Sequence, residues 1–153
     1  MKKVFLGLVL AMVSATGYAQ KDARIQEIRS AYANAKAKMS KDGKDGQSPR
    51  NLWIERNDVI DKEADVTEWE GTTIYFDSDT VDGREVNRPY FIVENWTAHQ
   101  HTRYREMLIN PKDSTLMFCY RRGETDAGFV VESRYYYDTE GQLIEEKHNT
   151  SNT

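Results

Sequence analysis

Residues 133–148 read SRYYYDTEGQLIEEKH, and this stretch decides the fold because three consecutive tyrosines stand directly before a turn. Aromatic residues favour strands, whereas the Asp-Thr-Glu-Gly segment that follows is typical of a turn. An apolar run restarts at Leu143. The stretch therefore predicts a β-hairpin, in which Tyr135 and Tyr137 point to one face of a sheet and Tyr136 points to the other.

The two faces of the first strand of this hairpin differ in character. Tyr135 shares its face with the apolar residues Phe129 and Val131, whereas Tyr136 shares its face with charged residues. We therefore expect the face of Tyr135 to pack against the core. Tyr136 is expected on a mixed face, where an amphipathic ring is stable.

Two earlier segments repeat the arrangement of the tyrosine hairpin: IYFDSDTVDG at 74–83 and MLINPKDSTL at 107–116. In each, apolar residues run into an Asp or Asn and then into polar turn residues. The side chains of Asp77, Asn110 and Asp138 are expected to accept hydrogen bonds from the turn backbone. The spacing is too irregular for a solenoid or a propeller, so these segments predict three hairpins of one sheet.

Short runs of aromatic and β-branched residues, separated by turn clusters, continue from residue 51 onward. With short connections, they favour an antiparallel meander of six or seven strands, of which the first has the weakest pattern. The expected strands are 52–56, 67–76, 89–96, 102–109, 115–121, 129–137 and 143–147.

Residues 22–40 show the clearest helical pattern. Asp22 is suited to the N-cap, and the Gly- and Asp-rich segment 41–50 predicts the end of the helix and a loop. The apolar side chains recur at helical spacing on one stripe, at Ile25, Ile28, Tyr32, Ala35 and Met39.

The N-terminal segment 1–19, MKKVFLGLVLAMVSATGYA, has the organisation of a secretory signal peptide. A basic start precedes an apolar stretch of about ten residues, which is too short to span a bilayer. Cleavage after Ala19 predicts a periplasmic or secreted protein without a membrane span. The mature chain then consists of a helix and loop at 20–50, a sheet at 51–148 and a disordered tail at 149–153, all in one domain.

The mature chain is acidic. Without the two lysines of the signal it has 19 basic and 25 acidic residues, a net charge of −6. This charge disfavours nucleic acid and anionic membranes as partners. Cys119 is the only cysteine, so no disulfide within the chain supports the fold, and its apolar neighbours predict a buried thiol.

The expected dimensions of helix and sheet carry a functional consequence. The helix is about 28 Å long and about 10 Å wide, whereas seven strands span about 34 Å. One helix therefore leaves part of a flat sheet bare, unless the sheet is twisted and curls around the helix. A bare face with amphipathic aromatic groups would meet another molecule. The aromatic candidates for this surface are Tyr90, Trp96, Tyr104, Tyr120 and Tyr136.

Two polar groupings are candidates for ligand binding. Arg103 and Arg105 alternate along one strand and Arg121 lies on the next, which predicts a cationic patch for a carboxylate or sulfate, with ion pairing to acidic neighbours as the alternative. His99 and His101 are two residues apart and share a face in an extended segment. They are metal candidates, although zinc needs a third ligand that the sequence does not place, and solvated turn histidines are the alternative.

The sequence contains no nucleophile elbow, zinc-protease helix, phosphate loop or Cys-x-x-Cys motif. Glu145 and Glu146 are adjacent in a strand and point opposite ways. A hydrolase with another pair of carboxylates is the remaining enzymatic alternative. We predict a protein without catalytic activity and without a cofactor.

The pattern RYREMLINPKDSTLMFCY at 103–120, followed by ESRYYYDTEGQLIEE at 132–146, resembles a group of small uncharacterised secreted proteins of Bacteroidetes-type bacteria. The resemblance covers most of the mature chain. It implies export, an early helix and a remainder rich in hairpins, and it supplies no catalytic residue.

These features predict an α+β protein in which one N-terminal helix packs on a twisted, curled antiparallel sheet. The leading functional hypothesis is a non-enzymatic binding or interaction module of the bacterial envelope, acting through the sheet face that the helix leaves uncovered. The alternative is a small-molecule carrier with a pocket between helix and sheet. The expected partner is accordingly an envelope protein, a small ligand or a second copy of the chain.

Overall fold

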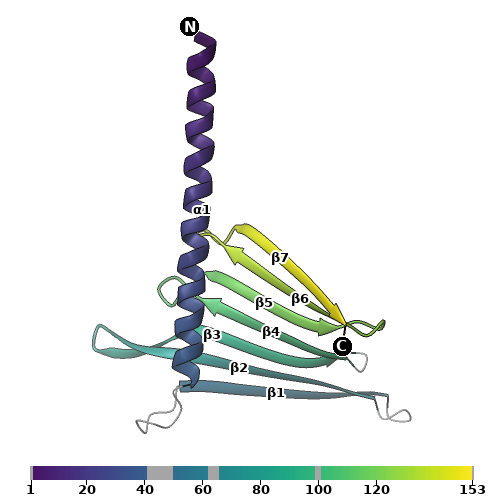
Figure 1. Cartoon of the computed structure of the whole chain (residues 1–153). Coiled ribbons are helices and arrows are strands. Elements are labelled where there is room, and N and C mark those ends of the chain that lie inside the picture. The colour runs from purple at the N-terminus through teal and green to yellow at the C-terminus, as the bar shows by residue number, and fades with distance from the viewer. Residues whose placement is uncertain (1, 41–49, 62–65, 99–100, 153) are drawn as a thin grey trace.

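Seven antiparallel strands form one open sheet, and among the described residues a single long helix crosses it on one face (Figure 1). The computed structural model describes the backbone of residues 2–40, 50–61, 66–98 and 101–152, and the side chains of residues 18–40, 50–56, 69–97 and 101–152. The elements are α1 (Lys2–Ser40), β1 (Arg50–Asp61), β2 (Val66–Val81), β3 (Arg84–Ala98), β4 (His101–Ile109), β5 (Leu116–Glu124), β6 (Phe129–Tyr137) and β7 (Leu143–Asn152).

The order of the strands in the sheet is their order in the sequence, and each neighbouring pair is antiparallel. The predicted α+β class and meander are therefore confirmed, with β1 and β7 at the edges. The disordered tail expected at 149–153 is wrong for residues 149–152, because β7 continues to Asn152 opposite Phe129. Backbone groups at the start of β6 need ladder partners, and these residues supply them.

Two of the three predicted turns lie where the sequence places them. The Asp138 carboxylate accepts a hydrogen bond from the backbone N–H of Gln142 at 2.8 Å, and the Asn110 side chain accepts one from Lys112 at 3.2 Å. The turn predicted at Asp77 is wrong. β2 continues to Val81, and the chain reverses at Asp82 and Gly83, whose φ angles of 51° and 74° suit a tight hairpin.

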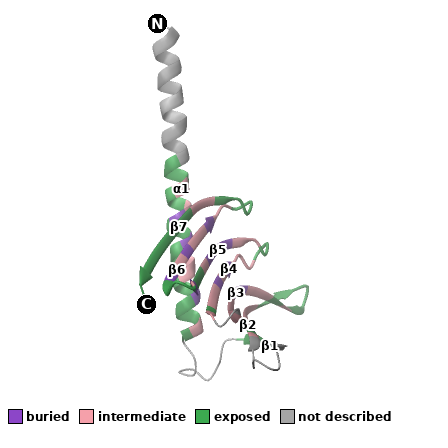
Figure 2. Cartoon of the chain, turned by 90° about the vertical axis from the view of Figure 1, so that its right-hand side faces the viewer, coloured by how far each residue is buried: buried purple, intermediate pink, exposed green. Residues whose placement is uncertain are grey.

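The core lies between the apolar stripe of α1 and one row of side chains that crosses the sheet (Figure 2). Ile28 and Phe91 are fully buried at its centre, and the Tyr32 ring packs edge-on against Phe118 with centroids 5.0 Å apart. The members of this inner row lie directly opposite one another on neighbouring strands: Tyr75, Phe91, Leu108, Phe118 and Tyr136.

The expected orientation of the tyrosine hairpin is therefore wrong. Tyr136, predicted on a mixed face, is 4% exposed and packs in the core, where Arg29 of α1 lies over its ring. Tyr135 points to the opposite face of the sheet. The helix selects the face of Tyr136 because that ring continues the inner row beside Phe118, at a centroid distance of 5.0 Å.

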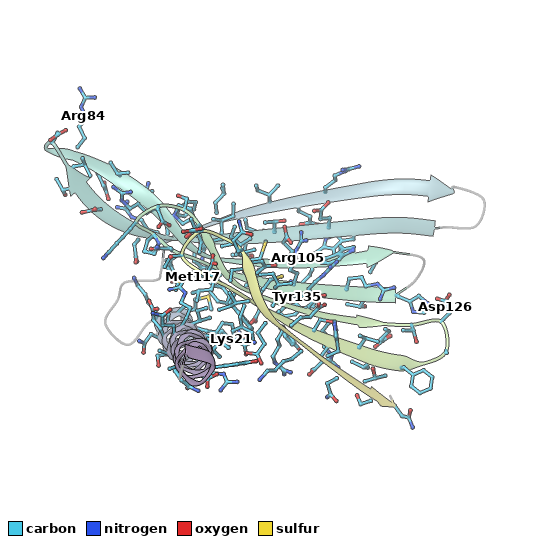
Figure 3. All side chains as sticks on the ribbon, turned by 90° about the horizontal axis from the view of Figure 1, so that it is seen from above. Lys21, Arg84, Arg105, Met117, Asp126 and Tyr135 are labelled. Carbon is cyan, nitrogen blue, oxygen red and sulfur yellow. The ribbon has the colours of Figure 1, made fainter. Side chains whose placement is uncertain are left out.

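α1 crosses the strands near one end of the sheet, so even the face on which it packs is only partly covered (Figure 3). Met117 lies close to the helix, whereas Asp126 marks the opposite end of the strands. Among the described side chains of α1, those that contact the sheet run from Arg24 to Met39, after the expected cleavage site. In the described part of the chain, the helix lacks an apolar stretch that could cross a membrane.

Candidate interaction surface

The face of the sheet opposite α1, here called the outer face, carries an apolar row that no described element covers. Its members lie directly opposite one another on six successive strands, and they stand back to back with the inner row. Leu52 is half exposed, Ile74, Ile92, Met107 and Tyr135 are partly buried, and only Cys119 is buried. This outer row consists of Leu52, Ile74, Ile92, Met107, Cys119 and Tyr135.

A charged row runs beside the outer row, offset from it by two residues on β4, β5 and β6. Arg105 and Arg121 lie directly opposite each other on β4 and β5, and Ser133 and His148 continue the row on β6 and β7. Because residues two apart in a strand are separated by about 7 Å, the apolar and charged rows form one amphipathic surface.

Arg105 already has its charge compensated. Its guanidinium donates to the Glu94 carboxylate, and it lies over the Trp96 ring at 5.6 Å from the ring centroid. The hydrogen bond to Glu94 raises the pKa of Arg105, so the guanidinium stays charged. The alternative of cross-strand ion pairing thus applies to this one member of the predicted patch.

Arg103 and Arg121 lack an acidic partner among the described residues. Arg103 lies across from Gly123, and a Cβ atom at Gly123 would approach Nη1 of Arg103 to 2.5 Å and Cδ to 2.8 Å. The glycine therefore gives the Arg103 side chain room to lie flat across β5. The structure brings Arg103, Arg105 and Arg121 together on the outer face, as the sequence predicts.

A short relay of polar side chains lies at the end of the charged row, on β6 and β7. The Ser133 hydroxyl lies 2.8 Å from Nδ1 of His148, and Nε2 of His148 lies 2.7 Å from the Glu146 carboxylate. The amides around Ser133 belong to the ladders that β6 forms with β5 and β7. The relay therefore orients polar groups on the outer face.

The outer face is hollowed where these groups meet. A shallow depression of about 370 Å³ includes Trp96, Arg103, Arg121, Ser133 and Tyr135 in its lining. Arg103 and Arg121, which lack an acidic partner among the described residues, both contribute to its lining. The depression thus combines aromatic walls with uncompensated positive charge.

On the helix face, a buried carboxylate ties α1 to the sheet. Glu106 is 3% exposed and accepts hydrogen bonds from the hydroxyls of Tyr32 and Tyr104 and from the Lys36 ammonium, the last at 2.6 Å. Burial alone would raise the pKa of Glu106, but the three donors outweigh it and the pKa is lowered. Burial and the hydrogen bonds to Glu106 raise the pKa values of Tyr32 and Tyr104.

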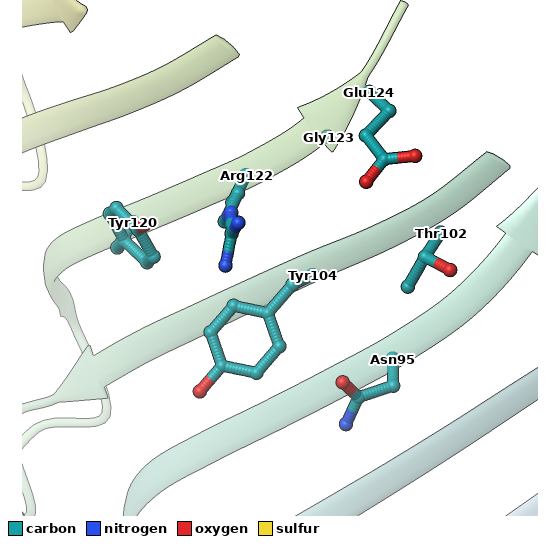
Figure 4. A pocket seen from close by; sticks show the side chains of 7 residues that line it. All are labelled: Asn95, Thr102, Tyr104, Tyr120, Arg122, Gly123 and Glu124. Atoms are coloured by element: carbon teal, nitrogen blue, oxygen red, sulfur yellow. The ribbon is translucent and has the colours of Figure 1, made fainter. Parts of the chain in front are cut away.

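A second depression, of about 430 Å³, lies on the helix face beyond α1 (Figure 4). Tyr104 and Tyr120 line it with polar neighbours from β3 and β5, and their rings meet edge-on at 6.1 Å. The Tyr120 hydroxyl donates to Glu132 at 2.7 Å. Neither this depression nor the outer one includes a residue of α1, so neither is the pocket between helix and sheet that the carrier hypothesis expects.

The five predicted aromatic residues do not share one surface. Tyr90 and Tyr136 are buried beneath α1, and Lys38 lies 4.7 Å from the centroid of the Tyr90 ring. Tyr104 and Tyr120 occupy the helix face beyond α1. Trp96 alone of the five lies on the outer face, beside the arginines.

The predicted metal ligands receive no third partner within the described residues. His99 lies outside those residues, and Nε2 of His101 lies 2.8 Å from the Asp126 carboxylate. The described side chains contain no group of three His, Cys, Asp or Glu residues that converge. Glu145 and Glu146 lie on opposite faces, as their adjacency in a strand predicts.

Sequence reasoning missed the outer row and the Glu106 cluster. The outer row depends on strand register, which a single sequence does not fix. A signal for Glu106 was present, because Glu106 is the one acidic residue in the run Arg103–Ile109 and alternates with Tyr104 and Leu108.

Comparison with known proteins found no matching family model, no matching curated protein and no matching solved structure. The fold and the surface chemistry are therefore the basis for the functional argument.

Proposed function

We propose that this chain is an exported, non-enzymatic interaction module that binds an envelope partner through its outer face. The observation that carries the proposal is the outer row, an apolar strip across six strands that no described part of the chain covers. A contiguous apolar strip that reaches the surface and is bordered by polar groups is characteristic of a protein interface. In this strip Leu52 is half exposed and four further members are partly exposed.

The chemistry of the outer face sets the character of the partner. The strip favours an apolar surface, and Arg103 and Arg121 on the same face favour negative charge, since neither forms an ion pair among the described residues and nearby Glu94 is paired with Arg105. An acidic protein that concentrates two uncompensated arginines at one place favours a partner with acidic groups at that place. The secretory signal expected before Gln20 supports an encounter in the periplasm or outside the cell.

Photo-crosslinking in cells tests the proposal. A photoreactive amino acid is placed at Ile74, which faces outward, or at Thr73, which is next to it on β2 and faces the helix side. We expect a discrete adduct from position 74 and none of that mass from position 73. The adduct should be lost when Ile92→Glu is introduced on the adjacent strand.

The partner found in the adduct is then purified on its own. It should bind the wild-type chain, and it should bind the Ile92→Glu variant at least tenfold more weakly. Equal adducts from positions 73 and 74, or no adduct from position 74, would exclude the outer face as the binding surface.

A further inference from the structure

The geometry of the outer face suits the binding of a second helix. On the other face, α1 lies across the strands, as Figures 1 and 3 show. Its apolar stripe packs against the inner row. The outer row is built from the neighbouring residue on each strand, such as Ile92 beside Phe91 and Met107 beside Leu108. The two rows therefore follow the same line through the sheet, one on each side.

The length of the outer row fits a helix. Six strands at about 4.8 Å spacing place its two ends about 24 Å apart. A helix of about 16 residues has this length at 1.5 Å per residue. A sheet with apolar groups on both faces reaches a stable layered arrangement when a second layer covers the second face.

The charge beside the row orients such a helix. On one side of the outer row, Arg121 is two residues from Cys119 on β5 and Arg103 is four residues from Met107 on β4. Neither arginine has an acidic partner in the described chain. On the opposite flank, Arg50 lies two residues from Leu52 on β1 and is paired with Glu85. A helix on the row would therefore meet uncompensated positive charge, among the described residues, on the Arg121 side.

We infer that the partner contributes an amphipathic helix of about four to five turns, which lies across the strands on the outer row with acidic side chains toward Arg103 and Arg121. The inference rests on the proposed function, because it specifies the partner of the same face. It adds the secondary structure, the direction and the charge of the bound segment.

Two synthetic helical peptides serve as probes. Both are about five helical turns long and carry the same leucine stripe, and one has glutamates along a single flank where the other has lysines. Binding of each labelled peptide to the signal-free chain is measured by fluorescence anisotropy. We expect the glutamate peptide to bind at least tenfold more tightly than the lysine peptide, and Ile92→Glu to weaken the binding of both at least tenfold.

The charge-swap variant Arg103→Glu with Arg121→Glu separates a specific contact from general attraction. This variant should invert the preference, so that the lysine peptide binds more tightly. A matched control is Arg84→Glu with Lys112→Glu, which makes the same change in net charge at the turns between β2 and β3 and between β4 and β5. The control should leave both affinities within about twofold of wild type.

Equal binding of the two peptides, or a preference that the charge swap does not invert, would overturn the inference. If the crosslink from Ile74 forms while both peptides fail to bind, the partner is not a helix and the proposed function stands. If the peptides bind as expected while Ile74 yields no adduct in cells, the outer face can bind a helix, but the proposal that it binds an envelope partner is wrong. Binding of the chain to anionic lipid vesicles in place of the glutamate peptide would also overturn the inference.

Discussion

The Tyr32 hydroxyl on α1 donates a hydrogen bond to the carboxylate of Glu106 on β4, and this contact joins the helix to the centre of the sheet. It is a polar contact in a largely apolar interface, so it specifies where along the sheet the helix docks. With Lys36 and Tyr104 it satisfies a carboxylate that is almost fully buried.

Removal of the Tyr32 hydroxyl should destabilise the fold. We expect Tyr32→Phe to lower the free energy of unfolding by about 1.5–3 kcal/mol, because a hydrogen bond to a buried charged group is lost. Tyr75→Phe is the matched control, since Tyr75 lies in the same core and its hydroxyl makes no hydrogen bond seen in the described chain. Urea denaturation gives the free energy of unfolding of each variant. Equal losses of this free energy would show that the hydrogen bond from Tyr32 to Glu106 adds no stability of its own.

The lowered pKa of Glu106 makes stability depend on pH in acid. The unfolded chain binds a proton at Glu106 near the ordinary pKa, whereas the folded chain resists protonation. The stabilisation is therefore complete above about pH 5 and is lost as the pH falls through the lowered folded value. Unfolding free energies measured from pH 6 to pH 3 should fall less steeply in Glu106→Gln, and identical slopes would contradict this assignment.

Tyr32, Tyr104 and Tyr120 should ionise late in alkali. Burial and the hydrogen bond to Glu132 raise the pKa of Tyr120 to about 12, and the pKa values of Tyr32 and Tyr104 are raised as well. Folded stability from Tyr120 is thus present below about pH 10 and is lost as the pH rises through about 12. Titration of tyrosinate absorbance should show a late phase that Tyr120→Phe reduces, and a single transition near pH 10 would refute it.

The substitution Gly123→Ala should lower the affinity for the glutamate peptide while it changes the stability of the fold little. In Gly123→Ala the new methyl group displaces the Arg103 side chain, whose Nη1 and Cδ atoms lie within 3 Å of that position. Because the far end of a flexible side chain can move, the melting temperature should change little. The affinity for the glutamate peptide should fall severalfold, and an unchanged affinity would mean that Arg103 does not contact the helix.

Signal removal should leave the fold intact. Among the described side chains, the contacts of α1 with the sheet begin at Arg24, so a chain that starts at Gln20 retains all of these contacts. We expect N-terminal sequencing of the exported protein to begin at Gln20, and the chain expressed from Gln20 to unfold cooperatively. Retention of the segment before Gln20 in the exported protein would contradict the predicted cleavage.

The sequence predicted the strands better than their faces. Alternation and turn residues located the seven strands, and Asn110 and Asp138 located two of the turns. The Asp77 turn was misplaced, because Asp82 and Gly83 supply the positive φ angles that a two-residue hairpin needs. Asp77 itself contacts Lys38 of α1, a tertiary contact that local turn chemistry does not include.

The candidate surface was only partly predictable for a related reason. The cluster of Arg103, Arg105 and Arg121 follows from alternation on adjacent strands, and it does not depend on which face α1 covers. The burial of Tyr136 in place of Tyr135 depends on which face α1 selects, and this is decided by packing against Phe118 and Phe91 across several strands. Such long-range contacts leave no periodic signal in the hairpin itself.

The most direct measurement of the central claim is hydroxyl-radical oxidation of Met107, compared between the purified chain and the chain in its native envelope. Met107 lies on the outer row, and the buried Met117 serves as the internal reference. If a partner covers the outer face, oxidation of Met107 relative to Met117 should be high in the purified chain and at least fivefold lower in the envelope. Equal relative oxidation in the two states would show that the outer face stays uncovered, and the interaction module would have no partner on it.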